Sequence, residues 1–463
     1  MERLYERYCA CGYRVTTDSR AIRGGEIFFA LRGENFDGND YAMRALEAGA
    51  AAAVVAADAG LPEGDARLIR VADPMATLRD LAIWHRTHVR GGQLPVLGLT
   101  GTNGKTTTKN LIAAVLARKY RITATRGNLN NDIGVPLSLL SITPDTEFAV
   151  IEMGANHPDD IAKLVRVSQP DYGLITNVGR AHLLGFGSFE GVKAAKGELY
   201  NWLGSHRGSL IFLNEDDPDL REMAAKQPCH VFGYGLKYQG AEVLPATPAE
   251  PFLRLRLGED VIRTHLVGAY NATNVLAALA VGEYFGVARR DAIEAVEGFI
   301  PDNNRSQMVR TARNTLIVDA YNANPSSMHA ALDNFRLVEA PRKLALLGDM
   351  RELGAESLAE HTKVLRLLLD AGIPACLVGD EFRQALDQLQ PPQTADQCGA
   401  VTSDQFGISV PVDQCGATAS GQFRWYPDSA ALADALAVDP VTDTVLLIKG
   451  SHSIQMERVL DRL

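Results

Sequence analysis

The residues best suited to chemistry lie in the glycine-rich segment GLTGTNGKTTT. Gly101 and Gly104 would let backbone N–H groups approach an anion, and a helix beginning near Lys105 would add its N-terminal dipole. Lys105 would reach the outer phosphates of a nucleoside triphosphate, and Thr106 would offer a hydroxyl to Mg²⁺. The strict pattern G-x-x-x-x-G-K-[ST] is not met, because Leu99 stands five residues before Gly104. An ordinary glycine-rich turn is the alternative, but the flanking strand and helix favour a nucleotide site.

Three further side chains would point toward this loop from the ends of predicted strands and helices. Glu152 ends a strand in IEMGANH, and a carboxylate there can reach a metal directly or through water. His182 follows the strand end ITNVGRAH, where a structural imidazole is an equal alternative. Lys196 lies on a predicted helix, where a lone lysine is usually a solvated cation. Taken one at a time, the three residues do not define a site.

Strands and helices alternate on both sides of the glycine-rich loop. The apolar or alternating runs predict strands over 27–31, 51–56, 68–72, 96–99, 148–153, 172–177, 210–213, 315–319, 343–347, 375–378 and 444–448. Helical periodicity is predicted up to 49, from 105 onward, over 159–167 and 188–203, and after 270. This order predicts the α/β class, with mostly parallel sheets and ligands at the carboxyl ends of the strands.

The length of 463 residues predicts about three domains. Residues 1–83 would form a small α/β N-terminal domain, and 84–310 a central parallel sheet with the phosphate-binding loop of a mononucleotide site. Residues 311–463 would form a Rossmann-like α/β domain that closes over the nucleotide, because they repeat the strand–helix alternation without a phosphate loop.

The composition limits the kinds of partner and the cellular location that can be expected. A net charge of −10 argues against nucleic acid, because no broad basic face is available. The start MERLYERYCACGYR is too charged for a signal peptide, and the longest apolar stretch, 48–57, is about ten residues and too short to cross a bilayer. A cytoplasmic protein is therefore expected. The six cysteines form no C-x-x-C pair and are interpreted as free thiols; they are Cys9, Cys11, Cys229, Cys376, Cys398 and Cys415.

A local duplication lies in the last third of the chain. DQCGAVTSDQF (396–406) recurs as DQCGATASGQF (413–423), with 8 of 11 positions identical. Two copies are too few for a solenoid, so the repeat is interpreted as a duplicated loop. We assign it no function.

Short strings spread along nearly the whole chain match a known pattern. They are TDSR, FFALRGENFDG, GLTGTNGKTTT, GNLNNDIGVPL, IEMGANHPDDI, TNVGRAHLLGFGS, AKGELY, YNATN, NNRSQ, DAYNANPSS, LGDMRELG and KGS. With these strings the chain resembles the Mur ligase family, the ATP-dependent enzymes that add amino acids and peptides to peptidoglycan precursors. IEMGANHP, DAYNANP and GDMRELG are most similar to the members that join D-alanyl-D-alanine to UDP-N-acetylmuramoyl-tripeptide.

The resemblance implies a role for each matching residue. ATP would be bound by Gly101, Thr102, Asn103, Gly104, Lys105, Thr106, Thr107, Asn271, Asn274, Arg305 and Asp319. Within this set, Asn271 and Asn274 would contact the adenine region, Arg305 the phosphates and Asp319 the ribose. The substrates would contact Ser19, Arg20, Phe29, Ala30, Asn130, Asn131, Asp132, Asn322, Asn324 and Ser326, the last three at the peptide site. The catalytic set would be Lys105, Glu152, His182 and Lys196.

The resemblance also implies two Mg²⁺ ions and a modified lysine. Thr106 and Glu152 would bind one Mg²⁺, His182 would serve the second, and Lys196 would be a metal ligand as a CO₂-derived carbamate. A neutral lysine that captures CO₂ becomes a carboxylate, which hard Mg²⁺ prefers to an ammonium. Lys193, three residues earlier on the same helix, is a competitor that spacing alone does not exclude.

Two positions depart from the pattern of relatives. Tyr270 stands where many relatives have histidine before the first asparagine of the adenine motif, which would keep stacking but lose an imidazole hydrogen bond. His452 follows KGS where relatives often have arginine, so a cationic role there would depend on pH.

The implied reaction proceeds through an acyl phosphate, formed by ATP on the terminal carboxylate of the tripeptide and attacked by the amine of D-alanyl-D-alanine. A monomer without nucleic-acid partner or membrane insertion is expected. The alternatives are a sibling ligase that adds a diamino acid, which usually carries a D-N-P-R motif absent here, and a folylpolyglutamate synthetase, which lacks the N-terminal loops. A nucleotide-binding protein without catalysis is the alternative from another class.

Overall fold

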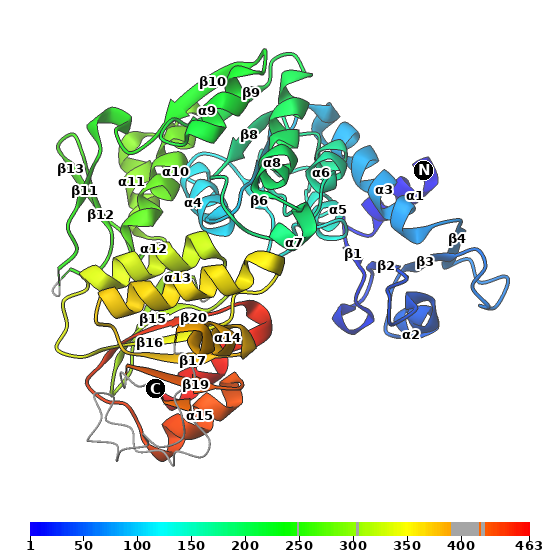
Figure 1. The fold of residues 1–463 in the computed structure, drawn as a ribbon. Helices are drawn as coiled ribbons and strands as arrows, with labels where there is room; N and C mark the ends of the chain where they lie inside the picture. Colours follow the sequence, from blue (N-terminus) through cyan, green and yellow to red (C-terminus); the bar gives the residue numbers. More distant parts are fainter. Residues whose placement is uncertain (248–249, 302–304, 390–415, 418–421) are drawn as a thin grey trace.

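The computed structural model describes residues 1–247, 250–301, 305–389, 416–417 and 422–463. Within these residues, four sheets and their helices form an N-terminal, a central and a C-terminal unit (Figure 1). The α/β class predicted from the alternation of strands and helices is confirmed.

The N-terminal unit is a parallel sheet with the strand order β1-β2-β3-β4. Its elements are α1 (Glu2–Ala10), β1 (Val15–Thr16), β2 (Ile27–Phe29), α2 (Ala42–Glu47), β3 (Ala52–Ala56), β4 (Leu68–Val71) and α3 (Pro74–His88). Successive side chains of a strand point to opposite faces, so Phe28 and Ala30 pack with α2 while Phe29 packs with Tyr8 and Leu78 of α1 and α3. The carboxylate of Asp73 caps α3 at its N-terminus.

The central unit is a parallel sheet with the order β10-β9-β8-β5-β7-β6. Its strands are β5 (Val96–Thr100), β6 (Ile122–Ala124), β7 (Phe148–Glu152), β8 (Tyr172–Ile175), β9 (Leu210–Asn214) and β10 (His230–Tyr234). Its helices are α4 (Lys105–Leu116), α5 (Gly134–Leu139), α6 (Asp160–Ser168), α7 (Leu183–Phe186), α8 (Phe189–Gly204), α9 (Pro218–Ala225), α10 (Ala272–Tyr284) and α11 (Arg289–Glu297). A small antiparallel sheet lies beside it, with β11 (Glu242–Leu244), β12 (Arg254–Leu257) and β13 (Asp260–Arg263).

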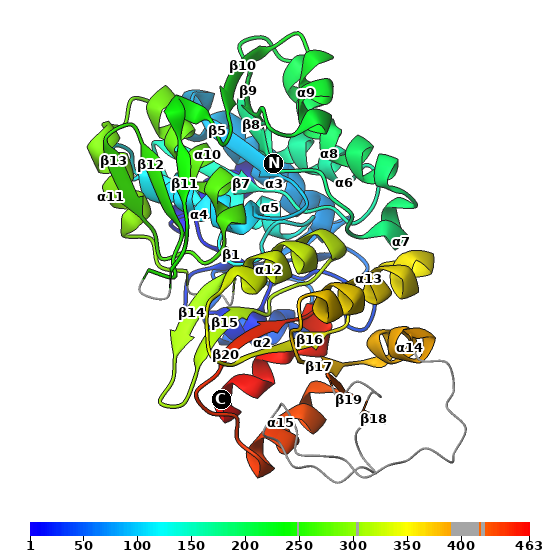
Figure 2. The same ribbon diagram turned by 60° about the vertical axis from the view of Figure 1, so that its left-hand side comes forward.

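Both faces of the central sheet are covered, which is why its middle strands are apolar along nearly their whole length. Every residue of β5 and of β7 is buried. Helices α4 and α10 pack on one face, and α3, α5, α6 and α8 pack on the other (Figure 2). The carboxyl ends of β5, β7 and β8 therefore meet at one edge.

The C-terminal unit has the strand order β14-β15-β20-β16-β17-β19-β18, with only the outer strands β14 and β18 antiparallel to their neighbours. Its strands are β14 (Gln307–Arg310), β15 (Thr315–Asp319), β16 (Lys343–Gly348), β17 (Ala375–Val378), β18 (Gly416–Ala417), β19 (Phe423–Tyr426) and β20 (Val445–Lys449). Its helices are α12 (Pro325–Leu337), α13 (Ser357–Asp370), α14 (Asp380–Leu389) and α15 (Ser429–Val438). Helices α12 and α13 lie between this sheet and the central unit (Figure 1, Figure 2).

The predicted boundary at 83/84 falls inside a helix, and the one at 310/311 falls at the turn of a hairpin. Helix α3 runs without interruption across the first boundary and packs on α1 as well as on α5 and α6. The second boundary lies between β14 and β15, which pair as a hairpin of the C-terminal sheet. By its hydrogen bonds, 307–310 thus belongs with the C-terminal unit.

Further sequence expectations concern the cysteines, the duplicated segment and membrane helices. Cys9, Cys11, Cys229 and Cys376 form no disulfide bond, whereas Cys398 and Cys415 lie outside the described residues. Nearly all of the duplicated segment, and Asn303 and Asn304 of NNRSQ, also lie outside them. In the described part of the chain, every helix is too short or too polar to cross a bilayer.

Candidate functional site

A cavity of about 700 Å³ lies between the central and C-terminal units. Its walls come from the loops at the carboxyl ends of β5, β7, β8 and β15, with β20 and the first turn of α12 on the far side. The predicted site residues that line it are Thr102, Asn103, Gly104, Lys105, Thr107, Asn130, Asn131, Asp132, Glu152, His182, Asn271, Asn274, Arg305, Asp319, Asn322, Asn324 and Ser326. The fold thus brings together side chains that are more than two hundred residues apart in sequence.

The glycine-rich loop has the tight geometry that an anion cradle needs. Gly101 has a φ of +143°, and an added Cβ would lie 2.0 Å from Oγ1 of Thr176. Gly104, at a φ of +79°, directly precedes α4. Nζ of Lys105 turns back onto this loop and donates to the carbonyls of Gly101 and Thr102 at 2.8 and 2.9 Å. Burial lowers the pKa of Lys105 to about 8, and an incoming phosphate would favour its charged form.

A buried carboxylate stands next to this loop. Oε1 of Glu152 accepts hydrogen bonds from Oγ1 of Thr106 at 3.1 Å and from Nδ2 of Asn130 at 2.9 Å. Its Oε2 is buried and accepts no hydrogen bond, although Nζ of Lys109 lies 3.7 Å away. Lys109, also buried, donates to the carbonyl of Thr125 at 2.6 Å.

These groups fit the magnesium ion that the sequence implies. An orphaned carboxylate oxygen beside a threonine hydroxyl is the hard-oxygen donor set that Mg²⁺ prefers, completed by phosphates and water. In the part of the chain that the structure describes, this site included, no three His, Cys, Asp or Glu side chains cluster as a preformed metal site. Glu152 and Thr106 would hold the ion only together with oxygens from a bound substrate.

Lys196 and Lys193 have opposite environments on α8. Lys196 is 2% exposed; its Nζ lies 3.4 Å from the carbonyl of Ala155 and 5.4 Å from the ring centre of Phe186. Burial, with a smaller effect of Lys105, lowers the pKa of Lys196 to about 7. Lys193 instead makes ion pairs with two carboxylates, which raise its pKa, so it stays an ammonium. Of the two lysines, Lys196 is the one whose lowered pKa favours the neutral amine that CO₂ requires.

His182 lies at the mouth of the cavity, at the junction with the C-terminal unit. Its backbone is left-handed, with a φ of +51°, and its Nδ1 contacts Oε2 of Glu352. Burial lowers the pKa of His182, against an opposing effect of Glu352. The neighbouring Arg180 pairs with Glu356 at 2.8 Å.

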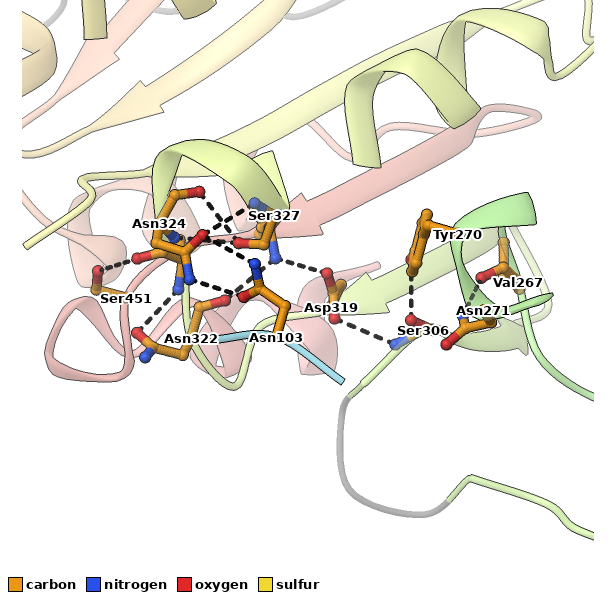
Figure 3. Close-up of polar contacts among 12 residues, drawn as sticks. Asn103, Val267, Tyr270, Asn271, Ser306, Asp319, Asn322, Asn324, Ser327 and Ser451 are labelled. Carbon is orange, nitrogen blue, oxygen red and sulfur yellow. Dashed lines mark hydrogen bonds and ion pairs between the residues drawn. The ribbon is translucent and has the colours of Figure 1, made fainter. Parts of the chain in front are cut away.

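Asp319 and Lys449 face each other at the carboxyl ends of adjacent parallel strands. The register of β15 and β20 pairs the two residues, and Nζ of Lys449 lies 2.6 Å from Oδ2 of Asp319. Oδ1 of Asp319 accepts from the backbone N–H of Ser306 at 3.2 Å (Figure 3). Nearby, the guanidinium of Arg305 stacks 3.7 Å from the ring centre of Tyr321, and its Nε is buried without a hydrogen bond.

The two asparagines of YNATN hold one another in place. Nδ2 of Asn271 donates to the carbonyl of Val267 at 2.8 Å, and its Oδ1 accepts from Asn274 at 2.9 Å. Oδ1 of Asn274 accepts from Thr108 at 3.0 Å and leaves no room for a side chain at Gly104. The hydroxyl of Tyr270 is hydrogen-bonded to Oγ of Ser306 at 2.9 Å (Figure 3).

Asparagines from the two units meet across the cavity. Nδ2 of Asn324 donates to Oδ1 of Asn103 at 2.8 Å, and Asn324 also caps α12 by accepting from the N–H of Ser327 (Figure 3). Oγ of Ser326 accepts from the N–H of Arg180 at 3.3 Å. Asn322 is exposed at the cavity wall. These contacts place the first turn of α12 directly opposite the glycine-rich loop.

Four predicted substrate residues lie in the N-terminal unit, away from this cavity. Arg20 is exposed and pairs with Asp18, and Ser19 is half-buried beside it. Phe29 and Ala30 are fully buried in the cores on the two faces of the sheet, so their side chains are not available to a ligand. Only their backbone could contact a substrate.

Sequence reasoning assigned no role to Lys449, Tyr321, Glu352 or Lys109. Lys449, Tyr321 and Glu352 lie in the strings KGS, DAYNANPSS and LGDMRELG, which match the family pattern. Their interaction partners, however, are more than ten residues away in sequence or belong to another unit. Lys109 follows the glycine-rich loop by one helical turn, which is the spacing that points a side chain back toward Thr106.

Three family profiles match most of the chain. They are the Mur ligase family catalytic domain over residues 13–85, the Mur ligase middle domain over 99–282, and the Mur ligase glutamate ligase domain over 304–452. Curated relatives include the UDP-N-acetylmuramoyl-tripeptide--D-alanyl-D-alanine ligases of Bacillus subtilis and Escherichia coli. Both are 37% identical; the first match covers 73% of this chain and 74% of the relative, the second 78% and 80%.

Solved structures agree with the sequence relatives. MurF from Acinetobacter baumannii superposes with a TM-score of 0.79 at 27% identity, covering 97% of this chain and 92% of that one. The MurF ligase of Thermotoga maritima, solved in complex with ADP, gives a TM-score of 0.76 at 25% identity, covering 97% and 96%. Together with the phosphate loop and the cavity between the two units, these matches identify the chain as a member of the Mur ligase family.

Proposed function

We propose that this protein is an ATP-dependent ligase that joins D-alanyl-D-alanine to UDP-N-acetylmuramoyl-tripeptide in peptidoglycan precursor synthesis. The observation that carries the proposal is one cavity lined on one side by the glycine-rich loop and Glu152, and on the other by Asn322 and Asn324, which directly precede α12. The relatives that carry this activity by name match most of the chain. We place the reaction in the cytoplasm and expect a monomer.

ATP would lie between the central and C-terminal units. Lys105 would leave the carbonyls of its own loop to bind the outer phosphates, joined by Arg305 from the facing side. Asp319 would accept from the ribose hydroxyls, with its orientation fixed by Lys449. The region of Asn271 would receive the adenine. The remaining loop residues in this role are Gly101, Thr102, Asn103, Gly104, Thr106, Thr107 and Asn274.

The substrates would approach from two directions. Residues 1–83 would bind the UDP end, through Ser19, Arg20 and the backbone of Phe29 and Ala30. Asn130, Asn131 and Asp132 would contact the tripeptide, whose carboxylate must reach the γ-phosphate. Asn322, Asn324 and Ser326, in the unit formed by residues 311–463, would face the incoming dipeptide, because the first turn of α12 borders the cavity opposite the loop.

The chain mainly positions the reactants. The tripeptide carboxylate attacks the γ-phosphorus and ADP leaves; the dipeptide amine then attacks the acyl carbon, and phosphate leaves with the former carboxylate oxygen. Lys105 stabilises the charge on the transferring phosphoryl group, and no side-chain nucleophile is needed. Closure of the C-terminal unit keeps water away from the acyl phosphate.

Two Mg²⁺ ions, when bound, offset the negative charge between the carboxylate and the γ-phosphate. Thr106 and Glu152 would hold the first ion, and His182 and the carbamate of Lys196 the second. Two observations support this assignment: the lowered pKa of Lys196, and the Oε2 of Glu152, which accepts no hydrogen bond and lies 3.7 Å from Nζ of Lys109.

The decisive experiment measures phosphate release from ATP with purified protein and defined substrates. Release should require both UDP-N-acetylmuramoyl-tripeptide and D-alanyl-D-alanine. Equal turnover with the dipeptide precursor and a free diamino acid would instead assign the chain to the sibling ligase. Turnover with neither pair would refute the proposal.

A further inference from the structure

Two left-handed residues meet where the C-terminal unit contacts the central unit. His182 has a φ of +51° and Glu352 a φ of +66°, and both are non-glycine residues, for which this conformation is costly. The imidazole Nδ1 of His182 contacts the carboxylate of Glu352. The backbone supports the same contact, because the N–H of Leu184 donates to the carbonyl of Glu352 at 3.2 Å.

The loop that carries Glu352 is held by buried polar groups beneath it. The N–H of Met350 donates to Nε2 of His361 at 3.0 Å, and both His361 and Asp349 are fully buried. The carboxylate of Asp349 accepts from two N–H groups at the start of α14, at 3.0 and 3.1 Å. The N–H of Arg351 donates to Oγ of Ser451 at 2.9 Å. These hydrogen bonds therefore fix the backbone of the loop that carries Glu352.

The carboxylate of Glu352 beside Nδ1 of His182 determines whether the other ring nitrogen, Nε2, carries a free lone pair. An acceptor at Nδ1 favours the tautomer with hydrogen on Nδ1, which leaves Nε2 with a free lone pair. Among the described residues, Nε2 of His182 has no hydrogen-bond partner, and the side chain lines the cavity. A histidine that binds a metal through one nitrogen usually donates from the other to a carboxylate in this way.

We propose that Glu352 is the positioning residue for His182: when the C-terminal unit closes, its carboxylate fixes the imidazole with Nε2 toward the cavity. The second cation position of the proposed function is thereby completed only in the closed arrangement, because the orienting group belongs to the other unit. This inference rests on the proposed function for the role of His182. The inference adds that closure of the C-terminal unit and cation binding are linked through the side chain of Glu352.

The chain offers a matched control for this idea. Glu356, four residues after Glu352, pairs with Arg180 across the same junction at 2.8 Å but does not contact His182. Both carboxylates are about half exposed, 53% for Glu352 and 45% for Glu356, so their replacement should leave the fold intact. Glu352→Ala removes the orienting group, whereas Glu356→Ala removes only an ion pair of the junction.

The test is a titration of the full-length protein with Mn²⁺ in the presence of a non-hydrolysable ATP analogue, followed by electron paramagnetic resonance. Glu352→Ala should weaken the second Mn²⁺ site about tenfold, Glu352→Gln should weaken it less, and Glu356→Ala should leave it within about twofold. In a His182→Ala background, Glu352→Ala should add no further loss.

Equal losses of Mn²⁺ affinity in Glu352→Ala and Glu356→Ala would overturn the proposal. The contact between the two units as a whole, and not Glu352, would then determine the affinity. Unchanged Mn²⁺ affinity in Glu352→Ala would overturn it as well. The result is separate from ligase activity: a wild-type protein that forms no amide would refute the proposed function, whatever the ratio of Mn²⁺ affinities.

Discussion

Replacing Lys196 by alanine should abolish nearly all ligase activity, and short carboxylates should restore part of it. With a pKa of about 7, on the order of half of the Lys196 side chains are neutral at pH 7. An ordinary lysine at 10.5 would be neutral in only about one molecule in 3,000. Burial therefore raises the population that can react with CO₂ by roughly three orders of magnitude. We expect a loss of at least about 100-fold in kcat for Lys196→Ala.

The assay is phosphate release from ATP with both substrates, with and without added acetate or formate. Lys193→Ala is the control, because Lys193 lies on the same helix but stays an ammonium between Asp219 and Glu222. It should keep activity within a few-fold. A Lys196→Ala variant that no carboxylate rescues, together with a rescuable Lys193→Ala variant, would refute the reasoning and move the carbamate.

Three other predictions concern Lys449 and Tyr321 at the site, and His85 between the N-terminal and central units. Lys449→Met leaves Asp319 without its cation, so KM for ATP should rise about tenfold while affinity for the dipeptide stays unchanged; equal losses for both would contradict this. Tyr321→Leu removes the stacking partner of Arg305, worth about 1 kcal/mol, and should raise KM for ATP roughly fivefold, whereas Tyr321→Phe should behave as wild type. Burial lowers the pKa of His85 to about 4 from 6.5, so the unfolded chain takes up a proton first as pH falls. The free energy of unfolding should therefore drop between pH 6.5 and 4, by up to about 3 kcal/mol. Urea denaturation of wild type and His85→Gln checks this, and an equal decline in both would contradict it.

Much of the fold could be predicted because its parallel strands are buried on both faces. β5 and β7 each begin with four residues that carry no polar side chain, 96–99 and 148–151, which mark buried strands without any knowledge of their partners. Three short strands, β6, β14 and β19, were not predicted, since they are three or four residues long and two of them are only half-buried. Their place is determined by the neighbouring strand, not by their own pattern.

Much of the site could be predicted where its residues belong to one local motif. Lys105, Thr106 and Gly104 follow one another in sequence, and the geometry of the turn is implied by the glycines. Lys449 could not be assigned in the same way, because its partner Asp319 lies 130 residues earlier and is adjacent only through the order of β15 and β20.

Burial separates residues whose roles sequence spacing alone does not distinguish. Lys193 and Lys196 share one helix, but burial lowers the pKa of Lys196, whereas Lys193 pairs with Asp219 and Glu222. Phe29 shows the opposite result: it lies in a motif expected to contact substrate, yet its side chain faces the core because successive residues of a strand alternate between faces.

The most direct test follows the oxygen atoms of the substrate acid. Tripeptide precursor labelled with ¹⁸O in its terminal carboxylate is converted with ATP, Mg²⁺ and D-alanyl-D-alanine, and the released phosphate is examined by mass spectrometry. If the loop from Gly101 to Thr106 presents the γ-phosphate to that carboxylate, each phosphate should carry one ¹⁸O atom. Amide formation with unlabelled phosphate would contradict this account.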